Sequence, residues 1–221
     1  MKKFALLFLL LPLVAAGCHH GLRSELKGSG KRVLEKRSVT PFTSISTEGA
    51  FDIEVVAQKD LALEVEGDDN ILKVVTSEVS HDVLRLRNTS DYSSTEPVKF
   101  RISVPNLEGL SVSGAGHIDI KNLNNAKFEI DASGAPTINV SGTTKVVDID
   151  SSGAGKIDTH NLHASRGVVD SKGVSRIDLD VADQLDVKIS GPSAVYYKGD
   201  PQINKTINGP GKVERRSGEG A

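Results

Sequence analysis

Six aspartates in the second half of the sequence lie at fixed positions relative to a recurring glycine. Three precede such a glycine by three residues and three follow one by five: Asp131, Asp150 and Asp170, and Asp119, Asp158 and Asp178. If successive repeats stack at the strand spacing of about 4.8 Å, the carboxylates of each set raise one another's pKa or attract a cation. Several oxygen ligands are what a hard cation requires. The six aspartates are therefore the candidate binding residues.

Two other interpretations of these aspartates stay open. The simpler one is a solvated outer face, because basic residues lie nearby to divide the negative charge: Lys127, Lys145, Lys156, Arg176 and Lys188. The other is a pair of carboxylates that cleaves a polysaccharide by acid–base chemistry.

Other chemical signatures are missing from the sequence. His81, His117, His160 and His163 do not have the spacing of a metal-binding motif such as HExxH, and there is no GxSxG or Walker sequence. The net charge of −2 and an aromatic content of 4% do not favour nucleic acid as a partner. We therefore predict no enzymatic activity, no catalytic residue, no metal site and no cofactor.

The glycines that frame the aspartates belong to a repeat of 18–20 residues, seen in copies such as VSGAGHIDI and SSGAGKIDT. An apolar residue follows each glycine at the fourth position, giving one column: Ile118, Ile138, Ile157, Ile177, Val195 and Val213. A second column precedes the glycines by four: Leu110, Ile130, Ile149, Val169, Val187 and, as its one polar member, Lys205. Polarity alternates between neighbouring residues, which is typical of strands.

Repeats of this length without helical periodicity predict an all-β solenoid. A single coil cannot bury its own apolar face, but stacked coils place the two columns above one another and form a continuous core. Leucine-rich repeats have a similar period, but no L-x-x-L-x-L run occurs. Residues 38–109 also alternate like strands, less regularly. We predict one domain over 38–213, in which 38–109 form opening coils or a cap and 110–213 the regular repeats, followed by a disordered tail at 214–221.

The N-terminal residues predict export and lipid attachment. Two lysines, an apolar run over 4–14 and small residues before Cys18 have the form of a signal peptide over residues 1–17. Val14-Ala15-Ala16-Gly17-Cys18 is similar to a bacterial lipobox, which implies lipid on Cys18, the single cysteine of the chain. Residues 18–37 are polar and basic, and we predict a flexible tether there. His19, rather than Asp, after the cysteine favours the outer membrane in a diderm bacterium.

The chain resembles the putative auto-transporter adhesin, head GIN domain, family of bacterial lipoproteins. The resemblance spans residues 38–213 and rests on the opening VTPFTSISTEGAFDIEV, the segment LEVEGDDNILKVVTSEV, the repeated SGA and SGP elements and the ending YYKGDPQINKTINGPGKV. It implies a right-handed parallel β-helix with coils of about 18–20 residues, exported and often lipid-anchored. It brings no catalytic residues with it.

We therefore expect a lipid-anchored cell-envelope protein that presents a β-helix for binding or adhesion. Its expected partners are a membrane, through lipid on Cys18, and a surface glycan or an envelope protein. The alternatives are a polysaccharide-active enzyme that uses the stacked carboxylates and a structural component that self-associates through exposed strand edges.

Overall fold

A computed structural model describes residues 25–216, and in this part of the chain the regular structure is entirely β-strand. The strands are β1 (Leu26–Lys27), β2 (Arg32–Lys36), β3 (Ser44–Glu48), β4 (Asp52–Ala57), β5 (Ala62–Asp68), β6 (Val75–Ser80), β7 (Val83–Asn88), β8 (Tyr92–Ser93), β9 (Lys99–Val104), β10 (Gly109–Gly114), β11 (His117–Gly134), β12 (Thr137–Ser151), β13 (Lys156–Ser171), β14 (Arg176–Ile189), β15 (Ala194–Lys198), β16 (Gln202–Ile207) and β17 (Lys212–Arg215). Within residues 25–216, no helix of the length and apolar character needed to span a bilayer is found.

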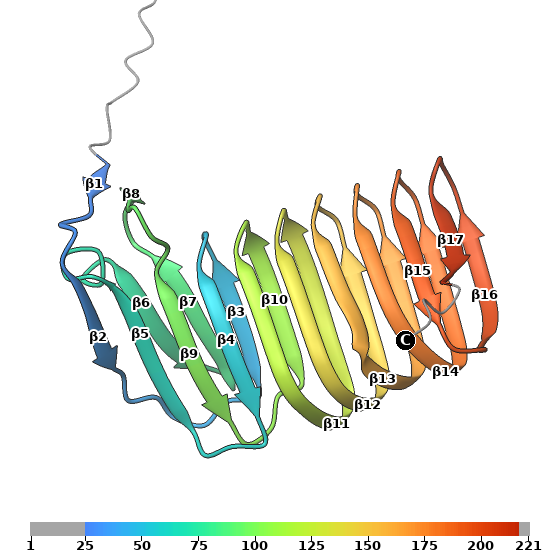
Figure 1. Cartoon of the computed structure of the whole chain (residues 1–221), viewed down its shortest axis with the longest axis horizontal. Helices are drawn as coiled ribbons and strands as arrows, with labels where there is room; N and C mark the ends of the chain where they lie inside the picture. Colours follow the sequence, from blue (N-terminus) through green and yellow to red (C-terminus); the bar gives the residue numbers. More distant parts are fainter. Residues whose placement is uncertain (1–24, 217–221) are drawn as a thin grey trace, which may run out of the picture.

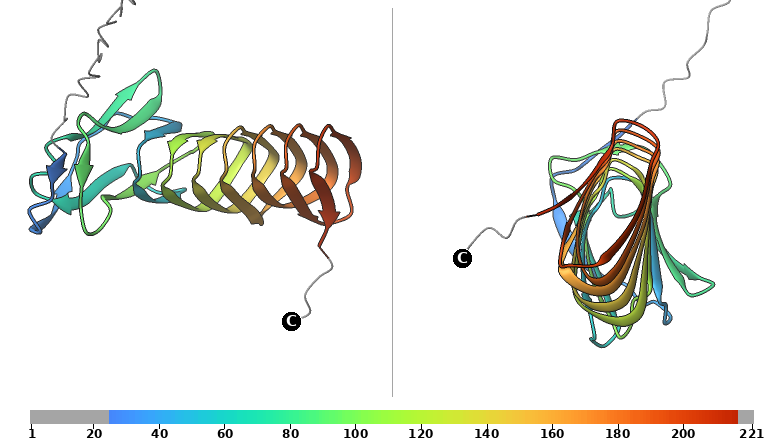
Figure 2. Two further views of the ribbon diagram at one scale, coloured as in Figure 1. Left: turned by 90° about the horizontal axis from the view of Figure 1, so that it is seen from above. Right: turned by 90° about the vertical axis from the view of Figure 1, so that its right-hand side faces the viewer.

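The strands wind into an elongated β-solenoid of about five turns, as the sequence predicts (Figure 1). Each coil has a flattened cross-section with two long sides (Figure 2). We call these sides sheet A and sheet B. Sheet A contains β7, β3, β10, the C-terminal halves of β11–β14, and β16; sheet B contains β9, β4, the N-terminal halves of β11–β14, β15 and β17.

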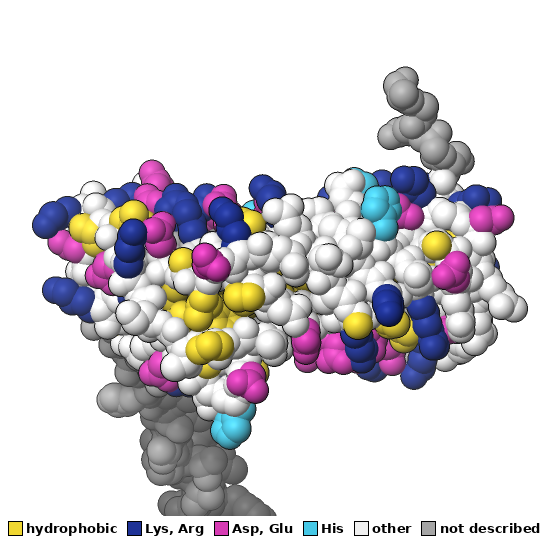
Figure 3. Space-filling model, turned by 90° about the horizontal axis from the view of Figure 1, so that it is seen from below, with side chains coloured by type: hydrophobic (Ala, Val, Ile, Leu, Met, Phe, Trp, Pro, Cys, Tyr) yellow, Lys and Arg dark blue, Asp and Glu magenta, His cyan; other side chains and the backbone are white. Residues whose placement is uncertain are grey.

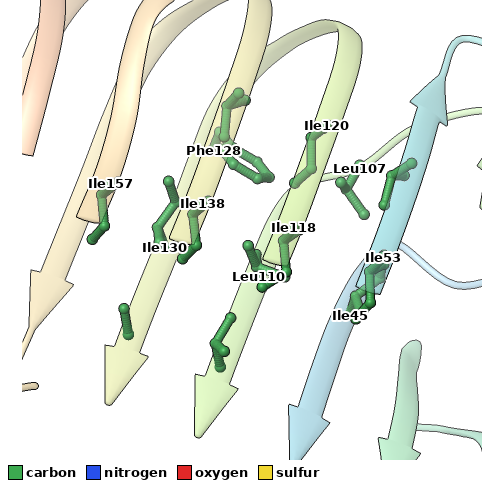
Figure 4. Packing of buried hydrophobic residues seen from close by; sticks show 14 of the residues in the cluster. Ile45, Ile53, Leu107, Leu110, Ile118, Ile120, Phe128, Ile130, Ile138 and Ile157 are labelled. Carbon is green, nitrogen blue, oxygen red and sulfur yellow. The ribbon is translucent and has the colours of Figure 1, made fainter. Parts of the chain in front are cut away.

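Both predicted apolar columns are confirmed by the strand register. On sheet B, Ile118 pairs in parallel with Ile138, and the alignment continues through Ile157 and Ile177 to Val195 and Val213. The sheet A column runs from Leu110 to Lys205 in the same way. Side chains of the two columns meet between the sheets (Figure 4). Ile118, Ile138, Ile157 and Ile177 are all fully buried.

A glycine lies at each corner where sheet A turns into sheet B. The backbones of successive corners are in direct contact there and leave no room for a Cβ atom. A Cβ on Gly134 would lie 2.5 Å from the carbonyl oxygen of Gly114, and one on Gly114 would lie 2.0 Å from that of Gly49. Gly134 also has a φ of 97°, which an L side chain rarely adopts. The glycine repeat is therefore a steric requirement of stacking, and it begins at Gly49, earlier than the sequence pattern suggests.

The first half of the chain does not stack in sequence order. β7 and β9 form one coil, which pairs with β3 and β4, and these pair in turn with β10 and β11. The coil formed by β3 and β4 therefore lies between two coils that come later in the sequence, as Figure 1 shows.

The N-terminal end of the solenoid is covered by antiparallel strands. β5 pairs with β9 on one side and β2 on the other, and β6 pairs with β7. Ile71 and Leu72, in the connection between β5 and β6, are buried against the core. The opening segment is thus both coil and cap.

Two predicted boundaries are wrong. Residues 32–36, expected in the flexible tether, form β2, because Val33 packs against the core and Arg37 donates hydrogen bonds to the carbonyls of Leu72 and Val75. Glu214 lies in β17 and Arg216 contacts the domain, so the tail does not begin at 214. The predicted signal peptide, Cys18 and residues 217–221 lie outside the described residues.

Candidate functional site

The outer face of sheet A carries the first predicted aspartate column. Asp131 pairs in register with Asp150, and Asp150 with Asp170, so the three carboxylates stand on successive rungs. The next two rungs place Lys188 and Thr206 at the same position. The half-exposed side chain of Asp150 makes this column accessible to a ligand.

Lysines interrupt the negative charge of this column. Lys172 Nζ lies 3.1 Å from Asp150 and 3.4 Å from Asp170, and Lys188 Nζ lies 3.6 Å from Asp170. The hydrogen bond to Asp150 raises the pKa of Lys172. Lys172 precedes its corner glycine, Gly173, where four other corners have a serine: Ser113, Ser133, Ser152 and Ser190. Asp131 has no ion-pair partner within residues 25–216, and it is the most available carboxylate of the three.

The second predicted column lies on the outer face of sheet B, but its members are not consecutive. Asp119 pairs in register with Glu54 and with Asn139, and Asn139 separates it from Asp158. Asp158 and Asp178 are true neighbours. Asp119 forms an ion pair with Lys121 at 2.9 Å.

Asp178 is buried beneath basic side chains, with an exposed fraction of 1%. Arg176 Nε donates to one carboxylate oxygen at 3.0 Å, and Arg216 Nη2 lies 2.6 Å from the other. On the following rung is Tyr196, whose ring centre lies 4.6 Å from the Arg176 guanidinium carbon and 5.0 Å from Lys212 Nζ. Asp178 therefore positions cations and is not itself presented to a ligand.

Asp158 has a comparable environment. Burial raises its pKa, but hydrogen bonds from His160 and the contact with Lys156 outweigh that effect and hold the pKa below its ordinary value. The two residues that contact its carboxylate, Lys156 and His160, are half exposed. As at Asp178, the carboxylate of Asp158 is less exposed than the side chains that contact it.

Two histidines near this column, His160 and His163, lie in β13. His163 Nδ1 lies 2.7 Å from Asp180, which also contacts Lys198 Nζ at 3.5 Å. A bulge between Thr159 and His163 brings His163 opposite Asp180. Across residues 25–216 there is no group of three or more His, Cys, Asp or Glu side chains arranged to hold a metal ion.

Both columns lie along the sides of the solenoid. Seen from below, charged side chains line both margins of the solenoid half of the molecule, and the surface between the margins is largely uncharged (Figure 3). Figure 1 shows that the bends between the two sheets, in the middle of β11–β14, lie on this lower side of the molecule.

A separate hollow of about 610 Å³ lies in the N-terminal cap. It is lined by the 91–97 segment with Glu25, Ala50 and Asn88. Burial raises the pKa of Tyr92, which lines the hollow. None of the six predicted aspartates belongs to it, so the cap and the solenoid faces are distinct surfaces.

The geometry defines a class of protein: a β-solenoid whose two flat outer faces carry charged residues in register. The chain belongs to the putative auto-transporter adhesin, head GIN domain, family, whose sequence profile matches residues 41–201. No curated protein gives a significant sequence match.

Solved structures share this fold. A putative adhesin from Bacteroides fragilis superposes with a TM-score of 0.73 at 22% identity, covering 86% of this chain and all of its own. A putative adhesin from Parabacteroides distasonis gives 0.58 at 20% identity, covering 87% and 100%. A putative lipid binding protein from the same species gives 0.57 at 19% identity, with the same coverage. At these identities the likeness establishes the fold alone.

Proposed function

We propose that this chain is a lipid-anchored cell-envelope protein that uses its β-solenoid as a non-catalytic binding module. The observation that carries the proposal is the register of the outward charges. Asp131, Asp150 and Asp170 occupy successive rungs above a fully packed core. Stacked strands give a long surface with a fixed pitch, which suits a repetitive or extended partner. Membership of an adhesin family supports the same role.

The proposed anchor rests on the sequence around Cys18. A lipobox-like stretch follows an apolar run of signal-peptide length. At least two acyl chains are needed for lasting attachment, and lipidation of the lipobox type supplies them. With His19 after the cysteine, the proposed destination in a diderm bacterium is the outer membrane.

Expression of the full chain in a diderm host with radiolabelled palmitate tests the anchor. We expect the label in the protein and the protein in the outer-membrane fraction. Cys18→Ser is expected to abolish the label and release the chain from the membrane. His19→Ala is the matched control and keeps both. Labelling of the Cys18→Ser variant, or its unchanged fractionation, would exclude lipid attachment at Cys18.

A binding screen tests the module itself. The full chain is offered surface glycans, peptidoglycan and envelope proteins, with and without Ca²⁺. We expect saturable binding to at least one of these ligands. If sheet A is the contact face, the triple variant Asp131→Asn, Asp150→Asn, Asp170→Asn is expected to bind that ligand more weakly. A folded, monodisperse chain that binds none of these ligands would refute the binding role.

The enzymatic alternative is disfavoured by the neighbours of the carboxylates. A glycosidase needs one carboxyl group with a raised pKa beside an ionised one. The pKa of Asp158 is lowered, and Asp178 is enclosed by two arginines. These pairings favour stable ion pairs over an acid–base couple.

A further inference from the structure

Three basic side chains converge on Tyr196 near the C-terminal end of sheet B. Arg176 and Arg216 approach the ring with their guanidinium carbons at 4.6 and 5.6 Å, and Lys212 Nζ lies at 5.0 Å. We call these four residues the Tyr196 cluster. Cation–π contacts of this kind hold the long side chains in place. Lys212 Nζ also donates to Glu214 at 2.9 Å, and both arginines contact Asp178, so three cations and two carboxylates leave one net positive charge.

The buried carboxylate of Asp178, beneath the cluster, fixes the geometry of the two arginines. Asp178 is 1% exposed, and it contacts Arg176 through Nε and Arg216 through Nη2. The side chains of the two arginines are 47% and 44% exposed. Within residues 25–216, the Nη1 and Nη2 groups of Arg176 have no hydrogen-bond acceptor, so donors remain for an external anion. A guanidinium held from below and open above is prearranged for an oxyanion.

The strand register places two of the cations on either side of a small residue. Arg176, Ala194 and Lys212 occupy the same outward position on three successive rungs, so Arg176 and Lys212 flank a methyl group. Two rungs amount to about 9.6 Å between the backbone positions, and both head groups lie against the Tyr196 ring, which is on the rung between them. Lys156 continues the row on the rung before Arg176. The basic positions therefore follow the solenoid axis.

We propose that the Tyr196 cluster binds the anionic groups of an acidic polysaccharide that lies along sheet B. The proposal rests on the proposed binding function and names its ligand class and face. A linear polymer can place successive oxyanions over Lys156, Arg176 and Lys212, which a single small anion cannot. Cations already lie against the Tyr196 ring, so recognition relies on charge and not on stacking of a sugar or a base.

The position of the cluster also favours a ligand away from the anchoring membrane. It lies in the last coils, at the opposite end of the long axis from β1 and β2 (Figure 1). Under the proposed lipid attachment at Cys18, this is the end remote from the anchor. Contact with the headgroups of the same membrane is therefore disfavoured.

The test measures binding of the full chain to polygalacturonate, dextran sulfate and neutral dextran. We expect binding to both acidic polymers, none to neutral dextran, and weakening as salt is raised, because exposed charges are screened. The double variant Arg176→Gln, Lys212→Gln is expected to weaken binding about ten-fold or more, the loss of roughly one charge-assisted contact. Lys212→Gln alone is expected to weaken it less, and it leaves the Asp178 contacts intact.

The matched control is Lys59→Gln, Lys73→Gln, which removes the same charge from exposed positions outside both aspartate columns. It is expected to change affinity by less than about two-fold, as exposed lysines contribute little individually. Loss of binding in this control to the same extent would overturn the proposal, as would binding that Arg176→Gln, Lys212→Gln leaves unchanged. Equal affinity for single-stranded DNA or anionic vesicles would overturn the glycan assignment. If other envelope ligands bind through Asp131, Asp150 and Asp170 while the acidic polymers do not bind, the proposed function stands and this inference fails.

Discussion

The corner glycine Gly153 is stacked directly on Gly134: a Cβ added to Gly153 would stand 1.9 Å from the Gly134 carbonyl oxygen. The corner also carries hydrogen bonds, since Ala154 N donates to Gly134 O and Val174 N to Gly153 O. On the inner side, buried serines join adjacent coils: Ser151 and Ser175 hydroxyls lie 2.6 Å apart. Backbone contact and side-chain polarity thus both fix the spacing of the coils.

Gly153→Ala is expected to destabilise the solenoid by about 2 kcal/mol or more, because the backbone must move to relieve the overlap. Chemical denaturation followed by circular dichroism measures the change in the free energy of unfolding. Gly109→Ala is the control, since its added Cβ meets only the side chain of Ser44, which can rotate. Equal stability of the two variants would contradict a steric role for the corner glycine.

Lys205 interrupts an apolar edge at the end of the solenoid. It is in register with buried Val187, between Ile203 and Ile207, which are both 36% exposed. Within residues 25–216, β16 pairs only with β14, so its outer edge is unpaired. A charge directed inward on an edge strand opposes pairing with another chain.

We expect Lys205→Val to increase self-association relative to the wild type, as measured by sedimentation velocity over a concentration series. Thr206→Val, one residue along on the outer side of the same strand, is the control for added apolar surface. It is expected to associate no more than the wild type. The same degree of association in both variants would show that Lys205 does not guard the edge.

Asp186 gives the fold a dependence on acid pH. Hydrogen bonds from Arg166, with a further one from Gln184, hold the pKa of Asp186 below its ordinary value of 3.8. A carboxyl whose pKa is lower in the folded state stabilises the fold above its unfolded-state pKa, and this stabilisation is lost as pH falls through the folded-state pKa.

Asp186→Asn is therefore expected to be less stable than the wild type at about pH 6, and the difference is expected to shrink as the pH falls below about 4. Urea unfolding at a series of pH values measures this. Asp183→Asn is the control, because Asp183 is exposed and has no ion pair within residues 25–216. A difference between Asp186→Asn and the wild type that is independent of pH would refute the linkage.

The regular half of the fold could be predicted because each glycine interval equals one coil. Counting from Gly114 or Gly153 puts Ile118 and Ile157 in the same column, as the register confirms. The order of the early coils could not be predicted in this way. The strands at 44–57 and 83–104 have the same alternation, and nothing local indicates that the later pair lies outside the earlier one.

The candidate site was only partly visible in the sequence, for two physical reasons. Bulges in the bend shift the register, so counting from a glycine fails beyond Thr159 and misses the pairing of His163 with Asp180. A contact residue that lies outside the repeats cannot be found by counting from a glycine. Arg216, which contacts Asp178 and follows the last strand, is such a residue. A signal was present at Tyr196, where an aromatic residue lies in the acidic column between Asp178 and Glu214.

Arg37 offers a test of where the domain begins. Its guanidinium donates to Val75 O at 2.8 Å and Leu72 O at 3.1 Å, and its side chain is 18% exposed. Arg37→Ala leaves these partly buried carbonyls without a donor, and we expect a loss of about 2–3 kcal/mol in the free energy of unfolding. Lys36→Ala, at an 84% exposed position, is expected to cost less than about 1 kcal/mol. The comparison is made by urea denaturation. Residues 32–37 would be a dispensable tether, and not part of the cap, if the two variants were equally stable.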